Sequence, residues 1–209
     1  MYTCTASTPI GAKKPTQFNA DPDKLDGNGR NLASVLGRME KDPSVRDTIL
    51  EWMELIAPGI EKIATEQQRL DSRTALLFKE QGTRRRFLAH MISDGAIHAL
   101  CLLVAALDAP DYGITLIEEP ERGLHPKATR EIIGLMRQQA SPERPIWLTT
   151  HSESVARASR LEELVLVDKM DGRTRMKSTD SANLTPDDLA PLTLDEAWLS
   201  NLFGGGIPW

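Results

Sequence analysis

Two apolar segments that end in ionisable residues constrain the fold of this chain more than any other feature. Residues 113–118 (GITLIE) run into Glu118 and Glu119, and residues 146–150 (IWLTT) run into His151. The first run does not alternate with polar residues, which is typical of a strand buried on both faces of a parallel sheet. A helical pattern separates the two runs, so the β-α-β order predicts a right-handed crossover between parallel strands.

The two predicted strands would bring their terminal side chains to one edge of the sheet. Adjacent parallel strands lie about 4.8 Å apart, and open α/β sheets bind ligands at the carboxyl edge. Glu118 and Glu119 would point opposite ways, as consecutive residues in an extended chain do. One carboxylate can hold Mg²⁺ while the other orients a water for attack on a γ-phosphate, with His151 near that phosphate. Solvation of two strand ends is the alternative for the glutamates, and a structural hydrogen bond is the alternative for His151.

A third candidate element is Ser93-Asp94-Gly95, which precedes the long apolar segment 96–107. Serine and aspartate cap helix N-termini, and the free N–H groups there attract anions. A glycine lets a phosphate approach the backbone closely. The segment therefore predicts a phosphate-contacting start of a buried helix, and an ordinary helix cap is the alternative.

The remaining pattern divides the chain into three parts. Residues 1–30 are expected to be irregular, residues 31–92 to form a helical and hairpin portion, and residues 93–209 to form an α/β lobe. The expected helices are 31–39, 44–57 (capped by Ser44), 96–107, 126–139, 153–159 and 195–202, and the expected strands are 74–79, 87–91, 113–118, 146–150, 164–168 and a polar strand after Asp171-Gly172. This order predicts an α/β fold whose largely parallel sheet is flanked by helices, after a less regular α+β N-terminal portion.

Composition limits the remaining function classes. A net charge of -5 argues against a surface that coats nucleic acid, although Arg84-Arg85-Arg86 could be either a DNA contact or a solvated turn. Cys4 and Cys101 have no CxxC partners, which argues against structural zinc and a disulfide framework. The longest apolar stretch, 99–107, is far shorter than the roughly 20 residues that span a bilayer. With no secretory signal pattern, a cytoplasmic location without membrane contact is expected.

Four segments resemble motifs of the ABC-type ATPases of the SMC-like and RecF-like branch, which have an AAA-type core domain. They read MISDGAIHALCLLVAAL, ITLIEEPERGLHP, IWLTTHSESVA and, at the end, LDEAWLSNLFGGGIPW. They look like the signature segment, the Walker B strand with its D-loop, the switch-histidine strand and the C-terminus of that branch. The resemblance covers residues 31–209.

The resemblance implies specific roles. Glu118 would be the Mg²⁺-associated acid, Glu119 the general base and His151 the switch histidine. Residues 123–126 would form the D-loop at a dimer contact. The Ser93-Asp94-Gly95 segment would bind the γ-phosphate of an ATP held by the opposing half of a dimer. Glu118 stands where aspartate is commoner in the family, and Ala96 stands where threonine is frequent.

The chain departs from the family in one larger respect. A Walker A loop reads G-x-x-x-x-G-K-[ST], and no segment of this sequence fits it. The segment 11–16 lacks the second glycine, and Gly204-Gly205-Gly206 is not followed by a lysine. We therefore expect the C-terminal lobe of a longer ATPase, separated from its Walker A portion by truncation, a split gene or a late assigned start.

Three functions follow from these observations. The first is an ATP-binding and ATP-hydrolysing lobe that uses Mg²⁺ and works only with a second lobe or a Walker A-containing partner, as an ATP-dependent homodimer or heterodimer. The second is a non-catalytic dimerisation module derived from such an ATPase. The third is a metal-dependent nuclease, which is less favoured because no further acidic-ended α/β repeat follows Asp168. DNA is left open as a partner.

Overall fold

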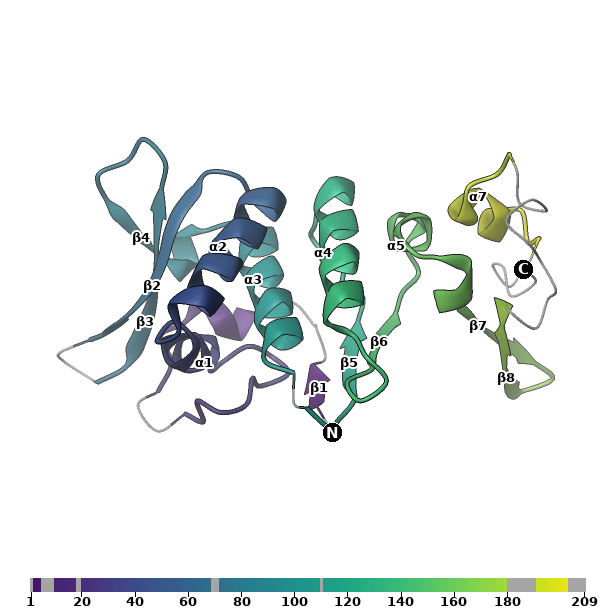
Figure 1. Cartoon of the computed structure of the whole chain (residues 1–209), viewed down its shortest axis with the longest axis horizontal. Helices are drawn as coiled ribbons and strands as arrows, with labels where there is room; N and C mark the ends of the chain where they lie inside the picture. Colours follow the sequence, from purple (N-terminus) through teal and green to yellow (C-terminus); the bar gives the residue numbers. More distant parts are fainter. Residues whose placement is uncertain are drawn as a thin grey trace. The chain divides into compact units, whose positions relative to one another are not determined.

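The computed structural model describes residues 2–4, 10–17, 20–68, 72–109, 111–179 and 191–202. The chain forms two compact units, Met1–His151 and Ser152–Trp209, which are described separately below (Figure 1). The division falls directly after the predicted switch histidine.

A three-stranded parallel sheet carries the two predicted strands. Its order is β1 (Tyr2–Cys4), β5 (Thr115–Glu118), β6 (Ile146–Thr149), and all pairs are parallel. The crossover between β5 and β6 is α4 (Pro126–Gln139), which begins at Pro126 as expected of a residue without an N–H to satisfy. The predicted parallel pair is confirmed. β1 lies in the segment expected to be irregular, since a three-residue strand is too short to show a periodic pattern.

The prediction that the strand 113–118 is buried on both faces holds fully for only one face. Thr115 and Ile117 are buried, but Leu116 is only partly buried, and its register partner Trp147 has a relative exposure of 59%. Leu116 and Trp147 share one face of the sheet because paired residues of neighbouring strands point the same way. Within the described residues, that face of β6 is left open to solvent at Trp147.

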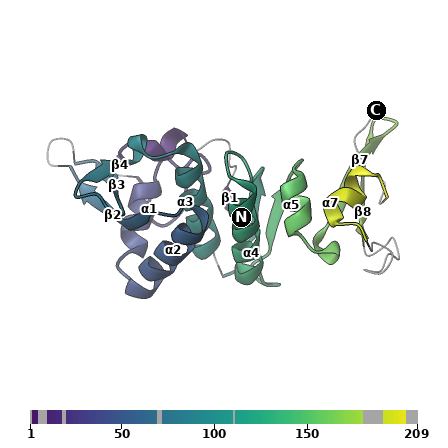
Figure 2. The same cartoon turned by 90° about the horizontal axis from the view of Figure 1, so that it is seen from above.

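The helical layer of the first unit consists of α1 (Leu32–Met39), α2 (Pro43–Ile56) and α3 (Asp94–Leu107), together with α4. Figures 1 and 2 both show α2 beside α3. Every residue of α3 from Ala96 to Ala106 is buried, as expected of a helix that is apolar all round. The cap of α2 is Asp42, whose carboxylate accepts from the Ser44 backbone N–H at 2.9 Å, and not Ser44 itself.

The antiparallel sheet of this unit has the order β2 (Ile60–Gln67), β3 (Thr74–Glu80), β4 (Arg86–Leu88). The β3–β4 hairpin is confirmed, although residues 89–91 form a 3-10 turn instead of extending β4. The sequence did not reveal β2, because charged residues interrupt its alternation. Arg86 lies 3.7 Å from Glu66 and Lys79 lies 2.7 Å from Glu61, so carboxylates on β2 already neutralise part of the basic hairpin. These ion pairs involve Arg86 and Lys79, and the two interpretations of Arg84-Arg85-Arg86 both stay predictions.

The second unit contains α5 (Glu153–Ala158), a 3-10 turn at Leu161–Glu163, β7 (Val165–Met170), β8 (Arg173–Ser178) and α7 (Leu194–Leu199). β7 pairs antiparallel with β8 and is not a third strand of the parallel sheet, which corrects the expected β-α-β-α-β continuation. Asp171 and Gly172 both have positive φ, the conformation of a tight hairpin turn that folds the chain back on itself. The Gly204–Gly206 segment lies outside the described residues.

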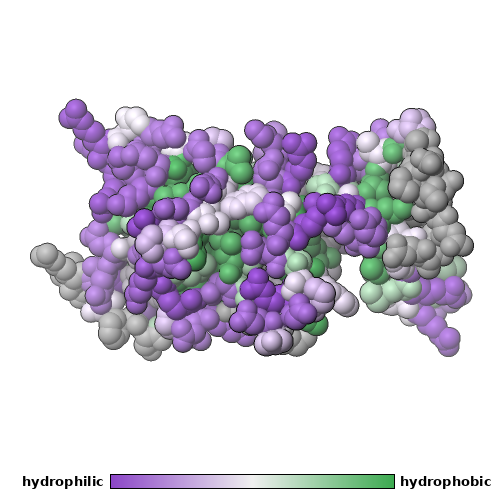
Figure 3. All heavy atoms as spheres, viewed as in Figure 1, coloured by the Kyte–Doolittle hydropathy of each residue, from purple (hydrophilic) through white to green (hydrophobic). Residues whose placement is uncertain are grey.

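Surface and core follow the expected partition. The Cys101 side chain is buried on α3. Figure 3 shows hydrophilic residues over most of the visible face, with smaller hydrophobic areas between them. In the described part of the chain, no helix is long and apolar enough to cross a membrane.

An ion pair between an exposed guanidinium and a buried carboxylate joins α5 to α7 in the second unit. The Arg157 guanidinium donates to Asp195 Oδ2 through Nε at 2.8 Å and through Nη2 at 2.5 Å. The Asp195 side chain is 1% exposed and that of Arg157 is 64% exposed. The hydrogen bond from Arg157 outweighs burial and lowers the pKa of Asp195 to about 2.

This asymmetry predicts that Arg157→Met loosens α7 more than Asp195→Asn does. The first change leaves a buried carboxylate without its cation, whereas the second releases an exposed cation to water. Amide exchange in residues 194–199 should rise by about tenfold in Arg157→Met, measured by mass spectrometry. In the unchanged chain the pair stabilises the fold fully above pH 3.8, the ordinary pKa of an aspartate in an unfolded chain. The stabilisation is lost as the pH falls towards about 2, the pKa of Asp195 in the folded chain. Equal effects of the two variants would contradict this account.

Candidate functional site

The ends of β5 and β6 bring the predicted acids and the predicted histidine to one end of the parallel sheet. Glu118 is the register partner of Thr149, and the Glu119 N–H donates to the Thr149 carbonyl at 2.8 Å. Thr150 and His151 follow directly. Glu118 and His151 are exposed, and the Glu119 side chain is 41% exposed. All three side chains are therefore accessible at the carboxyl edge, where α/β sheets bind ligands.

Glu119 does not continue the strand. Its φ is +47°, in the left-handed region, which costs a non-glycine residue roughly 1–2 kcal/mol. Pro120 adds to the conflict, since a residue before proline is normally extended. The expectation that the two glutamates point opposite ways assumed an extended chain at Glu119 and does not apply. The Glu119 carboxylate instead lies 3.7 Å from the Arg122 Nε.

Thr150 and Glu121 connect the two strand ends and were not found from the sequence. The Thr150 hydroxyl donates to Glu121 Oε1 at 2.7 Å. The other oxygen, Oε2, is buried and has no hydrogen-bond partner among the described residues. This contact fixes the loop after β5 against the end of β6. The only signal in the sequence is a third acid two residues beyond Glu119.

The start of α3 is capped as predicted and also carries an ion pair. Ser93 Oγ accepts from the Ala96 N–H at 3.2 Å. Asp94 lies 2.5 Å from the Lys13 ammonium, which also donates to the Ile92 carbonyl at 2.6 Å. The segment around Lys13, which does not fit a phosphate-binding loop, therefore folds as the 3-10 turn Ile10–Lys13 against the beginning of α3.

Gly95 has a structural role that the sequence did not reveal. A Cβ at this position would lie 2.5 Å from the Gly123 carbonyl oxygen, which is a backbone atom. The absence of a side chain lets the predicted D-loop pack directly on α3. Contact of Gly95 with a phosphate remains a prediction.

His98 is a second contact between α3 and the segment after Glu119. Its side chain is buried, at 2% exposed, and its Nε2 lies 3.2 Å from the Pro120 carbonyl. Burial lowers the pKa of His98, and Arg122 adds to this effect, against the opposing hydrogen bond to Pro120. The ring is therefore neutral at neutral pH, and Nε2 carries the proton that the carbonyl accepts.

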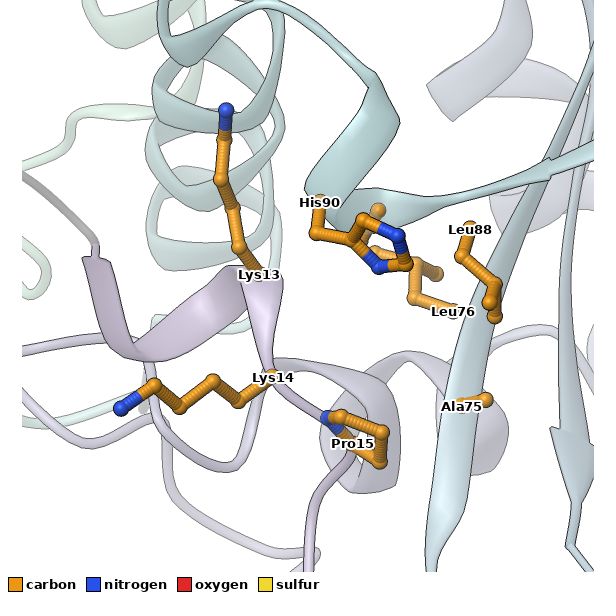
Figure 4. A pocket seen from close by; sticks show the side chains of 8 residues that line it. Lys13, Lys14, Pro15, Ala75, Leu76, Leu88 and His90 are labelled. Atoms are coloured by element: carbon orange, nitrogen blue, oxygen red, sulfur yellow. The ribbon is translucent and has the colours of Figure 1, made fainter.

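A small pocket lies away from this sheet edge, between the 3-10 turn Ile10–Lys13 and the antiparallel sheet (Figure 4). Its volume is about 200 Å³, and its lining residues are Lys13, Lys14, Pro15, Ala75, Leu76, Leu88, Ala89 and His90. Pockets for small-molecule ligands typically measure about 300–1,000 Å³. This pocket is too small to hold a nucleotide and contains none of the predicted site residues.

The residues at the ends of β5 and β6 fit a Mg²⁺ ion only in part. Among the described residues no group of three or more His, Cys, Asp or Glu side chains could hold a metal ion. Mg²⁺ usually takes only one or two protein carboxylates and completes its shell with water and substrate phosphates. An exposed carboxylate such as Glu118 is compatible with that mode, in which water and substrate phosphates supply the other ligands.

Residues 14–157 match the model of a protein family described as "AAA domain, putative AbiEii toxin, Type IV TA system". The chain belongs to this AAA-domain family. The match includes α3, both strand ends and the antiparallel sheet. It confirms the resemblance to ABC-type ATPases with an AAA-type core domain. A search of curated proteins gives no match.

Solved structures of SMC ATPase heads share the fold of this AAA-domain chain. One, from work on ATP-driven dimerization and DNA-stimulated activation of SMC ATPases, is 12% identical with a TM-score of 0.50, and the match covers 75% of this chain and 91% of that one. Another, an SmcHead bound to the C-winged helix domain of ScpA, is 13% identical with a TM-score of 0.59, and the match covers 85% of this chain and 55% of that one. At 12–13% identity the similarity shows a shared fold and nothing more. This shared fold confirms the predicted α/β class.

Proposed function

We propose that this chain is an ATP-binding lobe of an ABC-type ATPase that becomes active when a partner supplies the phosphate-binding loop. The observation that carries the proposal is the pairing of Glu118 with Thr149 at the end of β5 and β6. This register puts two acids and a histidine at one sheet edge of a chain that belongs to an AAA-domain family. The family relationship makes ATP the candidate substrate.

In this proposal each residue at the edge has a separate task. Glu119 accepts the proton of the attacking water, and its turned backbone places the carboxylate outside the line of β5. His151 contacts the γ-phosphate from the end of β6. Glu118 holds Mg²⁺ through the water shell of the ion, and the ion would offset charge on the phosphate oxygens.

The start of α3 has its task on the opposing nucleotide. Ser93, Asp94 and Gly95 would contact the γ-phosphate of ATP held by the second lobe. The helix begins with free N–H groups there, and the side chain of Ser93 already satisfies one of them. The carboxylate of Asp94 is paired with Lys13, which reduces its repulsion of an incoming phosphate.

The partner is either a second lobe or a separate protein with a Walker A loop. No GxxxxGK[ST] segment occurs in the 209 residues. Phosphates are normally held by the amides and lysine of that loop. A second copy of this chain cannot supply the missing loop. We therefore propose that a Walker A-containing protein joins this chain, and that the completed lobes pair as a homodimer or heterodimer on ATP binding. DNA is retained as a candidate partner, without a contact assigned to it.

The alternative function is a dimerisation module without catalysis. It would keep the α3 start and the segment 119–124 for contact with a partner, while Glu119 and His151 would have no chemical task. The two functions differ in one result, because only the first gives phosphate release when the phosphate-binding loop is supplied.

For the chain of residues 1–209 alone, we expect ATP–Mg²⁺ binding weaker than about 1 mM and negligible turnover. A nucleotide without its phosphate loop loses the main source of its binding energy. Calorimetric titration measures the affinity, and a phosphate-release assay measures turnover. Addition of a Walker A-containing fragment of a related ATPase should produce hydrolysis. Micromolar binding and steady phosphate release from the chain alone would contradict the requirement for a partner.

A further inference from the structure

His98 is a buried imidazole that has no task in the proposed hydrolysis. It lies three residues after Gly95, so both residues are on the same face of α3. That face meets the segment after Glu119 at two points. His98 Nε2 lies 3.2 Å from the Pro120 carbonyl, and Gly95 leaves room for the Gly123 carbonyl.

The backbone at Glu119 needs such support. A left-handed non-glycine residue persists only where its surroundings hold it. On the strand side, the Thr149 carbonyl accepts from the Glu119 N–H at 2.8 Å. Within the turn, the Arg122 N–H donates to the Glu119 carbonyl at 3.0 Å. The Pro120 carbonyl, next in the chain, accepts a hydrogen bond from His98 of α3.

We propose that His98 is a positioning residue, which holds the left-handed turn at Glu119 by donating a hydrogen bond to the Pro120 carbonyl. Through this bond the helix that starts with Ser93 is linked to the glutamate at the end of β5. The role of Glu119 in hydrolysis rests on the proposed function. The proposal that His98 holds the backbone at Glu119 does not depend on that function.

The two contacts connect the start of α3 to both parts of the segment 119–124. His98 contacts the first part of the segment 119–124, at Pro120. Gly95 packs against the last part of the segment, at Gly123. A shift at the beginning of α3 therefore moves both ends of the segment together. Binding of a ligand at the start of α3 would reach Glu119 along this route, over about one turn of helix.

A histidine that only fills space in the core makes a different prediction. In that case an apolar residue of similar size would serve as well as the imidazole. In the proposed role the donor is required, so leucine should fail and glutamine, whose amide can donate, should succeed. The variants His98→Leu and His98→Gln separate the two roles.

Amide hydrogen exchange of the full chain without nucleotide tests the proposal. The relevant amides are those of Glu119, Arg122 and Leu124, which close the turn by bonds to Thr149, Glu119 and Glu121. In His98→Leu they should exchange about tenfold faster, the factor expected from the loss of one ordinary hydrogen bond. In His98→Gln they should exchange at close to the unmodified rate. Ile97→Val, at a fully buried neighbour on α3, is the control for general loosening of the core.

Three outcomes would overturn the proposal. The first is unchanged exchange at the three amides in His98→Leu. The second is failure of His98→Gln to restore exchange, which would assign the support to ring packing. The third is an equal local increase in Ile97→Val. None of these readings depends on ATP, so failure of reconstituted hydrolysis would count against the proposed function and leave the role of His98 intact.

Discussion

Glu119→Gln should reduce ATP hydrolysis by at least about a hundredfold in the chain reconstituted with a Walker A-containing fragment. Glutamine cannot accept the proton of the attacking water, and it has nearly the same shape as glutamate. Nucleotide binding should be unchanged, because the substitution does not touch the phosphate contacts. Phosphate release gives the rate, and calorimetry with ATP–Mg²⁺ gives the affinity.

The matched control is Glu121→Gln, two residues away. An amide oxygen at this position can still accept from the Thr150 hydroxyl, so the loop after β5 keeps its contact with the end of β6. We expect its effect on the rate to be far smaller than that of Glu119→Gln. Unchanged hydrolysis in Glu119→Gln would remove Glu119 from the role of base. Equal losses in both variants would assign the effect to the negative charge of the region.

Gly95→Ala should lower the free energy of unfolding by about 1–3 kcal/mol. The new Cβ would lie 2.5 Å from the Gly123 carbonyl oxygen, and a backbone atom cannot move aside as a flexible side chain could. Either α3 or the segment 119–124 must shift. Chemical denaturation followed by circular dichroism measures the change.

Gly134→Ala is the control for this substitution. Gly134 lies inside α4, and a Cβ there would meet no heavy atom within 4 Å apart from its chain neighbours and the nearby backbone of its own helix. Alanine is the better helix former by about 0.8–1 kcal/mol, so this variant should be more stable than the unmodified chain. If Gly95→Ala were as stable as the unmodified chain, the close approach would be wrong. The two variants also bear on the proposed phosphate contact of Gly95. Weaker nucleotide binding by Gly95→Ala can be attributed to a lost phosphate contact only if the variant keeps its stability.

Local pattern in the sequence was sufficient for the elements that carry the site. The helix α4 begins and ends at the residues expected, because Pro126 starts it and apolar residues recur at helical spacing. The strands β5 and β6 follow from two apolar runs, and their parallel pairing follows from the helix between them. The apolar composition of 96–107 was enough to predict that α3 is buried.

Tertiary structure decided the features that join distant residues. Glu119 leaves the strand with positive φ, supported by Thr149 on one side and Pro120 with His98 on the other. Trp147 stands on an open face of the sheet, which an apolar run cannot reveal, since the run does not show what packs against it.

The physical reason lies in the range of the interactions. Helix and strand propensity act between residues a few positions apart, so the sequence by itself determined the elements, their order and the two strand ends with Glu118 and His151. The space left by Gly95, the donor at His98 and the turn at Glu119 depend on contacts between segments over twenty residues apart. Those contacts exist only once the parallel sheet and α3 have packed.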